Sequence, residues 1–270
     1  MISIDDPDDA RIAVYRDIRE RDLVGREGLF IAEGEVVLRH LLASRRFQTQ
    51  SVLLAEKRAA KLAPVAAALQ PNTPVYVASQ RVIDAVAGFA LHRGVLAVGK
   101  KAQAADAETL LAALPGPATV LVLHGIGNHD NVGGLFRNAA AFGADAVLLD
   151  PTSCDPLYRK AIRVSVGAAL LIPFARMAAG EDPVALLERH GVQPIALSPA
   201  GTERLADIAP PPRRAVILGA EGPGLPAALL ARCRSVRIPM AAGFDSLNVA
   251  VTGGIVLHHL ACARPEIPAR

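Results

Sequence analysis

Four short segments in the second half of the chain combine glycine with polar side chains, each directly after an apolar run. They are HGIGNHDN (124–131), SPAG (198–201), GAEGPGL (219–225) and PMAAGFDS (239–246). Glycine is expected where a main chain must approach a ligand closely, because it has no side chain to block the approach. Its recurrence at the ends of two neighbouring apolar runs, 219–225 and 239–246, predicts a ligand that is held largely by backbone.

Polar residues around the first and third of these segments are candidates for chemistry. Asn131 can cap a helix that Gly143 ends, and Arg137 lies off the apolar stripe of that helix. Arg137 can therefore face a ligand, although an arginine in this position is equally compatible with simple solvation. Glu221, in its glycine-rich loop, can accept hydrogen bonds from backbone or from Arg137, or can serve the loop structure alone.

The fourth segment leads into the last helix of the chain. Ser246 is the expected N-cap, which places Asn248 in the first helical turn. Gly253 and Gly254 lower helix propensity by roughly 1 kcal/mol each relative to alanine, so they indicate close packing against another helix. That helix can belong to this chain or to a second subunit. No His or Cys spacing suggests a metal site.

A basic cluster lies between the first and second segments. Its members are Arg159, Lys160, Arg163 and Ser165, followed by Gly167. Cationic side chains with a hydroxyl and a glycine can hold phosphate, and a basic helix face beside a sheet explains the cluster equally well.

The sequence Gly125-x-Gly127 suggests a dinucleotide site only weakly. No GxGxxG follows it, although Asp150 does end the next strand. An oxidoreductase that uses a nicotinamide cofactor is therefore a minor alternative.

Composition favours a globular protein of the reducing cytoplasm. Of 270 residues, 51% are hydrophobic, and the formal net charge of +3 is too small to demonstrate a nucleic-acid partner. Cys154, Cys233 and Cys262 are far apart in sequence, which argues against a disulfide framework or a zinc site. The acidic N-terminus lacks the apolar core of a signal peptide, and no apolar run is long enough to span a membrane.

Apolar runs alternate with helical patterns along the whole chain, so the predicted fold class is α/β. We expect a small α/β domain over 1–100, with a first helix over 7–22 and a helix over 57–70 in which Pro64 is a possible break. A linker is expected over 101–117, with a short helix at 107–114, and a second domain over 118–270. Strands that alternate with helices predict a parallel sheet covered on both faces, with ligands beyond the carboxyl ends of its strands.

The polar and glycine residues of the last 150 positions, taken in order, resemble a known family. The matching residues are Asn128, Asn131, Gly133 and Arg137; Ser165 and Gly167; Gly219, Glu221, Gly222, Gly224 and Leu225; Ile238, Pro239 and Met240; and Ser246, Leu247, Asn248 and Val249. This set resembles the SpoU (TrmH-type) RNA 2′-O-ribose methyltransferases of the SPOUT superfamily. The first hundred residues, through GLFIAEGEVVLRHLL and RGVLAVGKK, are similar to that family's L30e-like RNA-binding domain.

The resemblance implies a trefoil-knotted catalytic domain, S-adenosylmethionine as cofactor, a homodimer and no metal. It places catalytic function on Arg137, Asn131, Glu221, Asn248 and Ser246. It implies cofactor contacts from Leu197, Ser198, Gly219, Ala220, Glu221, Gly222, Gly224, Ile238, Met240, Ser246 and Leu247. It gives phosphate contacts to Arg159, Lys160, Arg163 and Ser165. One departure is His129, which stands where the family often has proline.

The predicted function is methyl transfer to a ribose 2′-hydroxyl of a structured RNA, either tRNA or rRNA. In this interpretation Asn131 and Glu221 orient Arg137, while Asn248 orients the ribose or its loop. A guanidinium is a very weak acid that keeps its proton in proteins, so Arg137 is better suited to stabilise a developing oxyanion than to act as a base. The alternative from another class is a non-catalytic RNA-binding protein that keeps the same fold.

Overall fold

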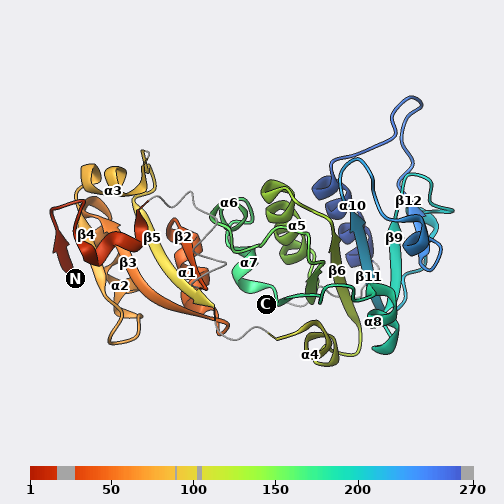
Figure 1. The fold of residues 1–270 in the computed structure, drawn as a ribbon, viewed down its shortest axis with the longest axis horizontal. Helices are drawn as coiled ribbons and strands as arrows, with labels where there is room; N and C mark the ends of the chain where they lie inside the picture. The colour runs from red at the N-terminus through yellow and green to blue at the C-terminus, as the bar shows by residue number, and fades with distance from the viewer. Residues whose placement is uncertain (17–27, 89, 102–104, 263–270) are drawn as a thin grey trace. The chain divides into compact units, whose positions relative to one another are not determined.

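The computed structural model describes residues 1–16, 28–88, 90–101 and 105–262. By its internal contacts the chain divides into two compact units (Figure 1). Unit 1 comprises Met1–Ala104 together with Asp155–Leu171, and unit 2 comprises Ala105–Cys154 together with Ile172–Arg270. The contacts thus group Asp155–Leu171 with the first hundred residues, whereas the sequence alone suggested an uninterrupted second domain.

Unit 1 is built on a five-stranded mixed sheet in the order β1-β4-β3-β5-β2. The strands are β1 (Ile2–Ile4), β2 (Leu29–Glu33), β3 (Phe47–Ala55), β4 (Val75–Ala78) and β5 (Val95–Lys101). β1, β4 and β3 run parallel, while β5 and β2 pair antiparallel. The short edge strand β1 was not predicted, because three residues carry too little pattern to recognise.

In the described part of unit 1, five α-helices accompany the sheet. They are α1 (Glu35–Ala43), α2 (Glu56–Ala67), α3 (Gln80–Ala87), α6 (Arg159–Val164) and α7 (Ala168–Leu171). Pro64 lies inside α2 without ending it, so the break considered there is wrong. α3 shares a core with the sheet in which Ile83, Leu53 and Leu96 are fully buried. α1 contacts β2, β3 and β5 and buries Leu38 and Leu41.

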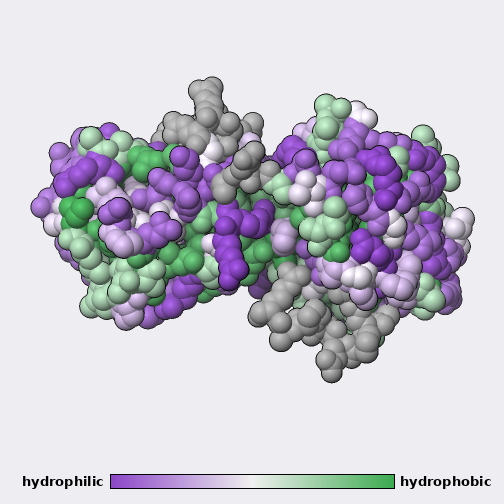
Figure 2. Space-filling view, turned by 90° about the horizontal axis from the view of Figure 1, so that it is seen from below, coloured by the Kyte–Doolittle hydropathy of each residue, from purple (hydrophilic) through white to green (hydrophobic). Residues whose placement is uncertain are grey.

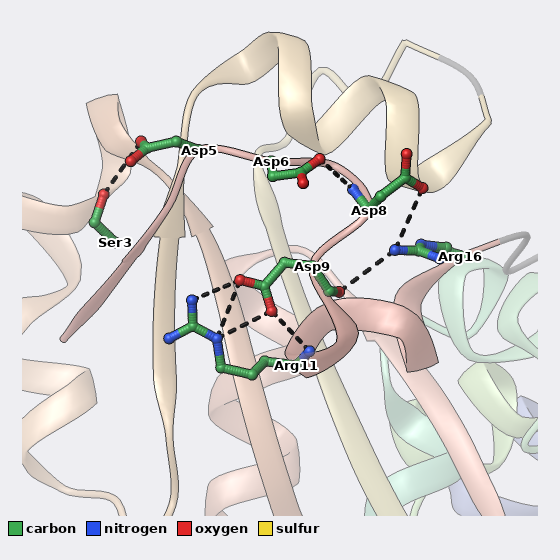
Figure 3. Close-up of polar contacts among 7 residues, drawn as sticks. All are labelled: Ser3, Asp5, Asp6, Asp8, Asp9, Arg11 and Arg16. Carbon is green, nitrogen blue, oxygen red and sulfur yellow. Dashed lines mark hydrogen bonds and ion pairs between the residues drawn. The ribbon is translucent and has the colours of Figure 1, made fainter.

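Two aspartates of the acidic N-terminal segment form ion pairs with nearby arginines (Figure 3). Asp9 caps the 3-10 helix η1 (Ala10–Tyr15) by accepting from the Arg11 backbone N–H, and it also pairs with the Arg11 guanidinium. Arg16 donates to the Pro7 carbonyl at 3.2 Å and pairs with Asp8. The helix expected over 7–22 is therefore a single short 3-10 helix up to Arg16, and the remainder of that prediction lies outside the described residues.

Unit 2 is built on a seven-stranded sheet in the order β10-β12-β9-β11-β6-β7-β8, in which every pairing is parallel. The strands are β6 (Ala118–His124), β7 (Ala146–Leu149), β8 (Phe174–Arg176), β9 (Gln193–Leu197), β10 (Glu203–Arg204), β11 (Arg213–Gly219) and β12 (Arg234–Arg237). The predicted parallel α/β sheet is confirmed, and only the two-residue β10 was missed.

Helices cover both faces of this sheet. One face packs against α4 (Ala107–Ala112) and α8 (Pro183–Arg189), with Leu111, Leu186 and Ile217 in a shared core. On the other face α5 (His129–Ala141) and α10 (Val249–Cys262) lie side by side (Figure 1). A Cβ on Gly253 would lie 2.4 Å from Leu135 Cδ2, so this glycine lets α10 pack closely on α5 of the same chain.

Hydrophilic and hydrophobic residues are interspersed on the face of the molecule seen in Figure 2. Within the described ranges, no helix is long and apolar enough to cross a bilayer.

Candidate functional site

The loop after β11 is folded back tightly on its own strand. Gly224 donates its backbone N–H to the Ala220 carbonyl at 3.1 Å, and Gly222 and Gly224 have φ values of 88° and 67°. A Cβ on Gly219 would lie 2.5 Å from the Gly224 carbonyl carbon, a separation that no side chain tolerates. Gly219 is therefore needed for the close approach of this loop to its own strand, and a ligand held by the main chain of the loop stays a prediction.

Two further loops leave the same edge of the sheet, because β9, β11 and β12 are parallel neighbours. After β9, the Ser198 N–H donates to the Val236 carbonyl at 3.0 Å, which joins this loop to β12. After β12, the chain runs through Ile238 and Met240 into a turn closed by Phe244 N–H donating to the Ala241 carbonyl. The three loops meet around one cavity.

The cavity has a volume of about 790 Å³, within the usual range for small-molecule sites. All eleven residues expected to contact the cofactor line it: Leu197, Ser198, Gly219, Ala220, Glu221, Gly222, Gly224, Ile238, Met240, Ser246 and Leu247. The other lining residues are Pro199, Ala200, Leu218, Asp245, Asn248, Val249 and Thr252. Among the described residues that line the cavity none is Lys, Arg or His, so these residues offer no cation to a phosphate group.

A chain of hydrogen bonds runs from α5 to the cavity wall. The Asn131 side-chain amide, which is 5% exposed, donates to Glu221 Oε1 at 2.7 Å. Asn248 Nδ2 donates to Asn131 Oδ1 at 2.9 Å and to Glu221 Oε1 at 3.3 Å. Two amides thus hold the Glu221 carboxylate and connect three segments that are far apart in sequence. Three of the predicted catalytic residues are therefore together.

Asn248 also caps the last helix, which corrects the assignment of Ser246 as its N-cap. Asn248 Oδ1 accepts from the backbone N–H groups of Ala250 at 2.9 Å and Val251 at 3.2 Å. Ser246 instead lines the cavity, and its hydroxyl contacts Asp245 Oδ1 at 3.3 Å. Asn248 uses its oxygen for the helix and its nitrogen for the Asn131–Glu221 pair, so one side chain couples the helix start to the site.

The cap of α5 is likewise one turn earlier than expected. Asn128, not Asn131, accepts from the backbone N–H groups of Asp130 and Asn131. His129 is the first helical residue, a position that favours proline because its N–H is not needed there. Histidine at this position leaves the Asn128 cap in place. Gly143, at φ 68°, does follow the end of the helix as predicted.

Arg137 is exposed in the middle of α5. The expected contacts of Asn131 and Glu221 with this guanidinium are not seen; Glu221 Oε1 accepts from the Asn131 and Asn248 amides instead. Its neighbour Asn138 donates to the Ala250 carbonyl at 2.7 Å and fixes α5 against the first turn of α10. The helix that carries Arg137 is therefore firmly attached to the cavity wall.

The predicted phosphate-binding residues lie in unit 1, and they differ in their exposure and in their contacts. Arg159 donates to Glu33 Oε2 at 2.6 Å, and Ser165 is 1% exposed with its hydroxyl donating to the Ile162 carbonyl. Both are thus engaged in internal contacts, which argues against a phosphate role for either one. Lys160 and Arg163 are exposed.

The residues Gly125 and Asp150, which suggested a dinucleotide site, form a structural turn instead. Asp150 is 5% exposed and accepts from Thr152 Oγ1 and from Ser153 Oγ, both at 2.6 Å. Burial acts to raise the Asp150 pKa, but hydrogen bonds from Ser153, Thr152 and Gly125 outweigh it and hold the pKa below its usual value. An acid engaged in this way is not available for a nucleotide ribose, and the cavity lies at other strands.

Comparison with known proteins identifies the class to which this fold and cavity belong. The model of the SpoU rRNA methylase family matches residues 118–258. The chain therefore belongs to the SpoU rRNA methylase family.

Individual relatives agree with this assignment. An uncharacterized tRNA/rRNA methyltransferase of Mycobacterium bovis is 40% identical over 94% of this chain and 89% of its own length. A 23S rRNA (guanosine-2′-O-)-methyltransferase RlmB of a Burkholderia species is 32% identical over 70% of this chain and 78% of its own. The crystal structure of an AdoMet-bound rRNA methyltransferase from Sinorhizobium meliloti superimposes with a TM-score of 0.82 at 22% identity, covering 95% of this chain and 96% of that one. These similarities confirm the family and the fold expected from the sequence motifs.

Proposed function

We propose that the protein is an S-adenosylmethionine-dependent RNA methyltransferase that acts on a ribose 2′-hydroxyl of tRNA or rRNA. The observation that carries the proposal is the cavity at the ends of β9, β11 and β12, lined by every residue expected to contact the cofactor. Its position beyond the carboxyl ends of parallel strands is where such sheets bind ligands. The RlmB relative, named as a guanosine 2′-O-methyltransferase, supports the choice of ribose oxygen.

The lining residues suit this cofactor. Gly222 and Gly224 have open space where a side chain would lie, which leaves their main chain accessible to a ligand, and Leu197, Ile238 and Leu247 supply apolar contact. The carboxylates Glu221 and Asp245, with no basic residue in the lining, suit a cationic ligand better than a pyrophosphate. When bound, S-adenosylmethionine supplies a methyl group activated by a positively charged sulfonium. The same charge argument disfavours the nicotinamide alternative.

Arg137 is the residue proposed to act on the RNA. Its guanidinium can stabilise negative charge that develops on the ribose 2′-oxygen and can bind an adjacent phosphate. Asn131, Glu221 and Asn248 hold the cavity wall and α5 in fixed relation, which serves the alignment of the acceptor oxygen. Ser246 lines the same cavity.

The test is the variant Arg137→Ala. We expect it to bind S-adenosylmethionine as the wild type does, measured by calorimetry, and to lose methylation of cellular RNA from a deletion strain. Unchanged turnover would refute the role of Arg137. A wild-type protein that binds RNA but not S-adenosylmethionine would instead establish the non-catalytic alternative.

We further propose that the enzyme is a homodimer that meets its RNA in the cytoplasm. The large apolar side chains of Val251 and Ile255 on α10 are 52% and 40% exposed, and Leu247 and Phe244 are exposed in the preceding loop. Such a group of exposed apolar side chains is typical of an interface between subunits.

We also propose a division of the chain into three parts by sequence. Residues 1–100 form the RNA-binding domain, 101–117 the linker and 118–270 the methyltransferase domain with its trefoil knot. The family match over 118–258 supports the last of these.

A further inference from the structure

Asp245 gives the cavity a negative charge from outside the residues that carry the family resemblance. It stands in the loop before α10 and lines the cavity together with Glu221. The two carboxylates differ in their surroundings, because Glu221 is held by Asn131 and Asn248. Asp245 has a single contact among those found for the described residues, from the Ser246 hydroxyl at 3.3 Å.

Asp245 has no evident structural task. The N-cap of α10 is Asn248, three residues further on, so the Asp245 carboxylate does not serve that helix. Several exposed aspartates elsewhere in the chain pair with arginine, as Asp182 does with Arg232. For Asp245 no ion pair with a basic side chain is found in the part of the chain that the structure describes.

We propose that Asp245 is a specificity-determining residue that favours the methyl donor over the product left after transfer. This inference rests on the proposed function. S-adenosylmethionine carries a sulfonium and an ammonium against one carboxylate, whereas S-adenosylhomocysteine has lost the sulfonium charge and is neutral overall. A nearby carboxylate therefore stabilises the donor more than the product. The cavity otherwise binds both ligands through the same main-chain and apolar contacts. The difference in affinity would therefore help S-adenosylmethionine to replace S-adenosylhomocysteine after each transfer.

The experiment measures the dissociation constants of both cofactor forms by calorimetry on the full chain, at low ionic strength. For Asp245→Asn we expect donor binding to weaken about fivefold, the effect of one unit charge acting through a water-exposed site, while product binding changes by less than about twofold. Asp245→Glu retains the charge and should restore most of the preference. Asp207→Asn, an exposed acid of the 3-10 helix η3 (Leu205–Asp207) that is not part of the cavity lining, is the matched control and should change neither constant.

Equal weakening of donor and product in Asp245→Asn, or no change in either, would overturn the proposal and leave the proposed function intact. A wild-type protein that binds neither form would refute the proposed function itself. Raising the salt concentration should lower the preference of the wild type for S-adenosylmethionine over S-adenosylhomocysteine, because salt screens the Asp245 charge. The preference should approach the value measured for Asp245→Asn.

Discussion

Replacing Asn248 separates the two tasks of its side chain. The oxygen caps α10 through Ala250 and Val251, while the nitrogen donates to Asn131 and Glu221. Asn248→Asp keeps an N-cap of comparable strength, removes both donors and places a second carboxylate beside Glu221. Asn248→Ala removes the cap and the donors together. Comparing the two variants isolates the polar network from the helix cap.

The magnitudes follow from these contacts. Loss of the helix cap costs about 1 kcal/mol, and loss of the hydrogen bonds that the Asn248 side-chain nitrogen donates costs about 1 kcal/mol more. Asn248→Ala should therefore lower the free energy of unfolding by about 2 kcal/mol. For Asn248→Asp, like charges in a solvated site contribute about 1 kcal/mol of repulsion, and the loop that carries Glu221 moves away from α5. Because that loop forms a wall of the cavity, we expect both variants to bind S-adenosylmethionine about tenfold more weakly than the wild type. This corresponds to about 1.4 kcal/mol of binding free energy.

The assays are calorimetric binding of S-adenosylmethionine and urea unfolding of the same preparations. Asp106→Ala is the matched control, since Asp106 caps α4 in the same unit by accepting from Thr109 N–H at 2.7 Å and does not line the cavity. It should lose about 1 kcal/mol of stability and keep wild-type binding. If Asn248→Asp binds the donor as tightly as the wild type while Asn248→Ala does not, the helix cap and not the polar network shapes the cavity, and the reasoning is wrong.

Two other predictions concern stability and assembly. The folded-state pKa of Asp150 is depressed, so its contribution to stability is present above the unfolded pKa of about 4 and is lost as pH falls below it. Asp150→Asn should therefore lower the urea midpoint at pH 7, and the gap from the wild type should narrow below about pH 4; a gap that stays constant with pH would contradict the role given to this carboxylate. Val251→Asp places a charge on the exposed apolar face of α10 and should convert the proposed dimer to a monomer in sedimentation equilibrium, with Asp207→Asn as the unaffected control. A wild-type monomer at micromolar concentration would refute the dimer.

The sheet of unit 2 could be predicted because its strands are short apolar runs that end in glycine or polar residues. The apolar runs that precede the segments 124–131, 198–201, 219–225 and 239–246 correspond to β6, β9, β11 and β12. The cavity loops followed from the same pattern, since parallel strands place their carboxyl ends on one edge. The strands β1 and β10 were not predictable, because two or three residues at a sheet edge are defined by their neighbour's hydrogen bonds and not by their own pattern.

The helix caps were misplaced because local sequence offers chemically equivalent candidates. In NHDN either asparagine can accept from backbone N–H groups, and the structure uses Asn128 for the cap while Asn131 donates to Glu221, 90 residues away. The contact of Arg159 with Glu33 spans 126 residues and removes Arg159 from the set of exposed cations in the same way. Contacts between residues this far apart in sequence decide which of several suitable side chains caps a helix and which one bonds to another segment at the cavity.

The same network bears on how Arg137 acts. A guanidinium paired with a carboxylate would lose much of its field at a reacting oxygen, because the two charges oppose each other. Here Glu221 Oε1 accepts from two neutral amides, and among the described residues no ion pair is found for Arg137. Its positive charge is therefore not offset by this acid and can act on the RNA backbone and on an oxygen that becomes negative during transfer. We propose that Asn131 and Glu221 fix the cavity wall to α5, a different task from the direct orientation of Arg137 that the motif alone suggested.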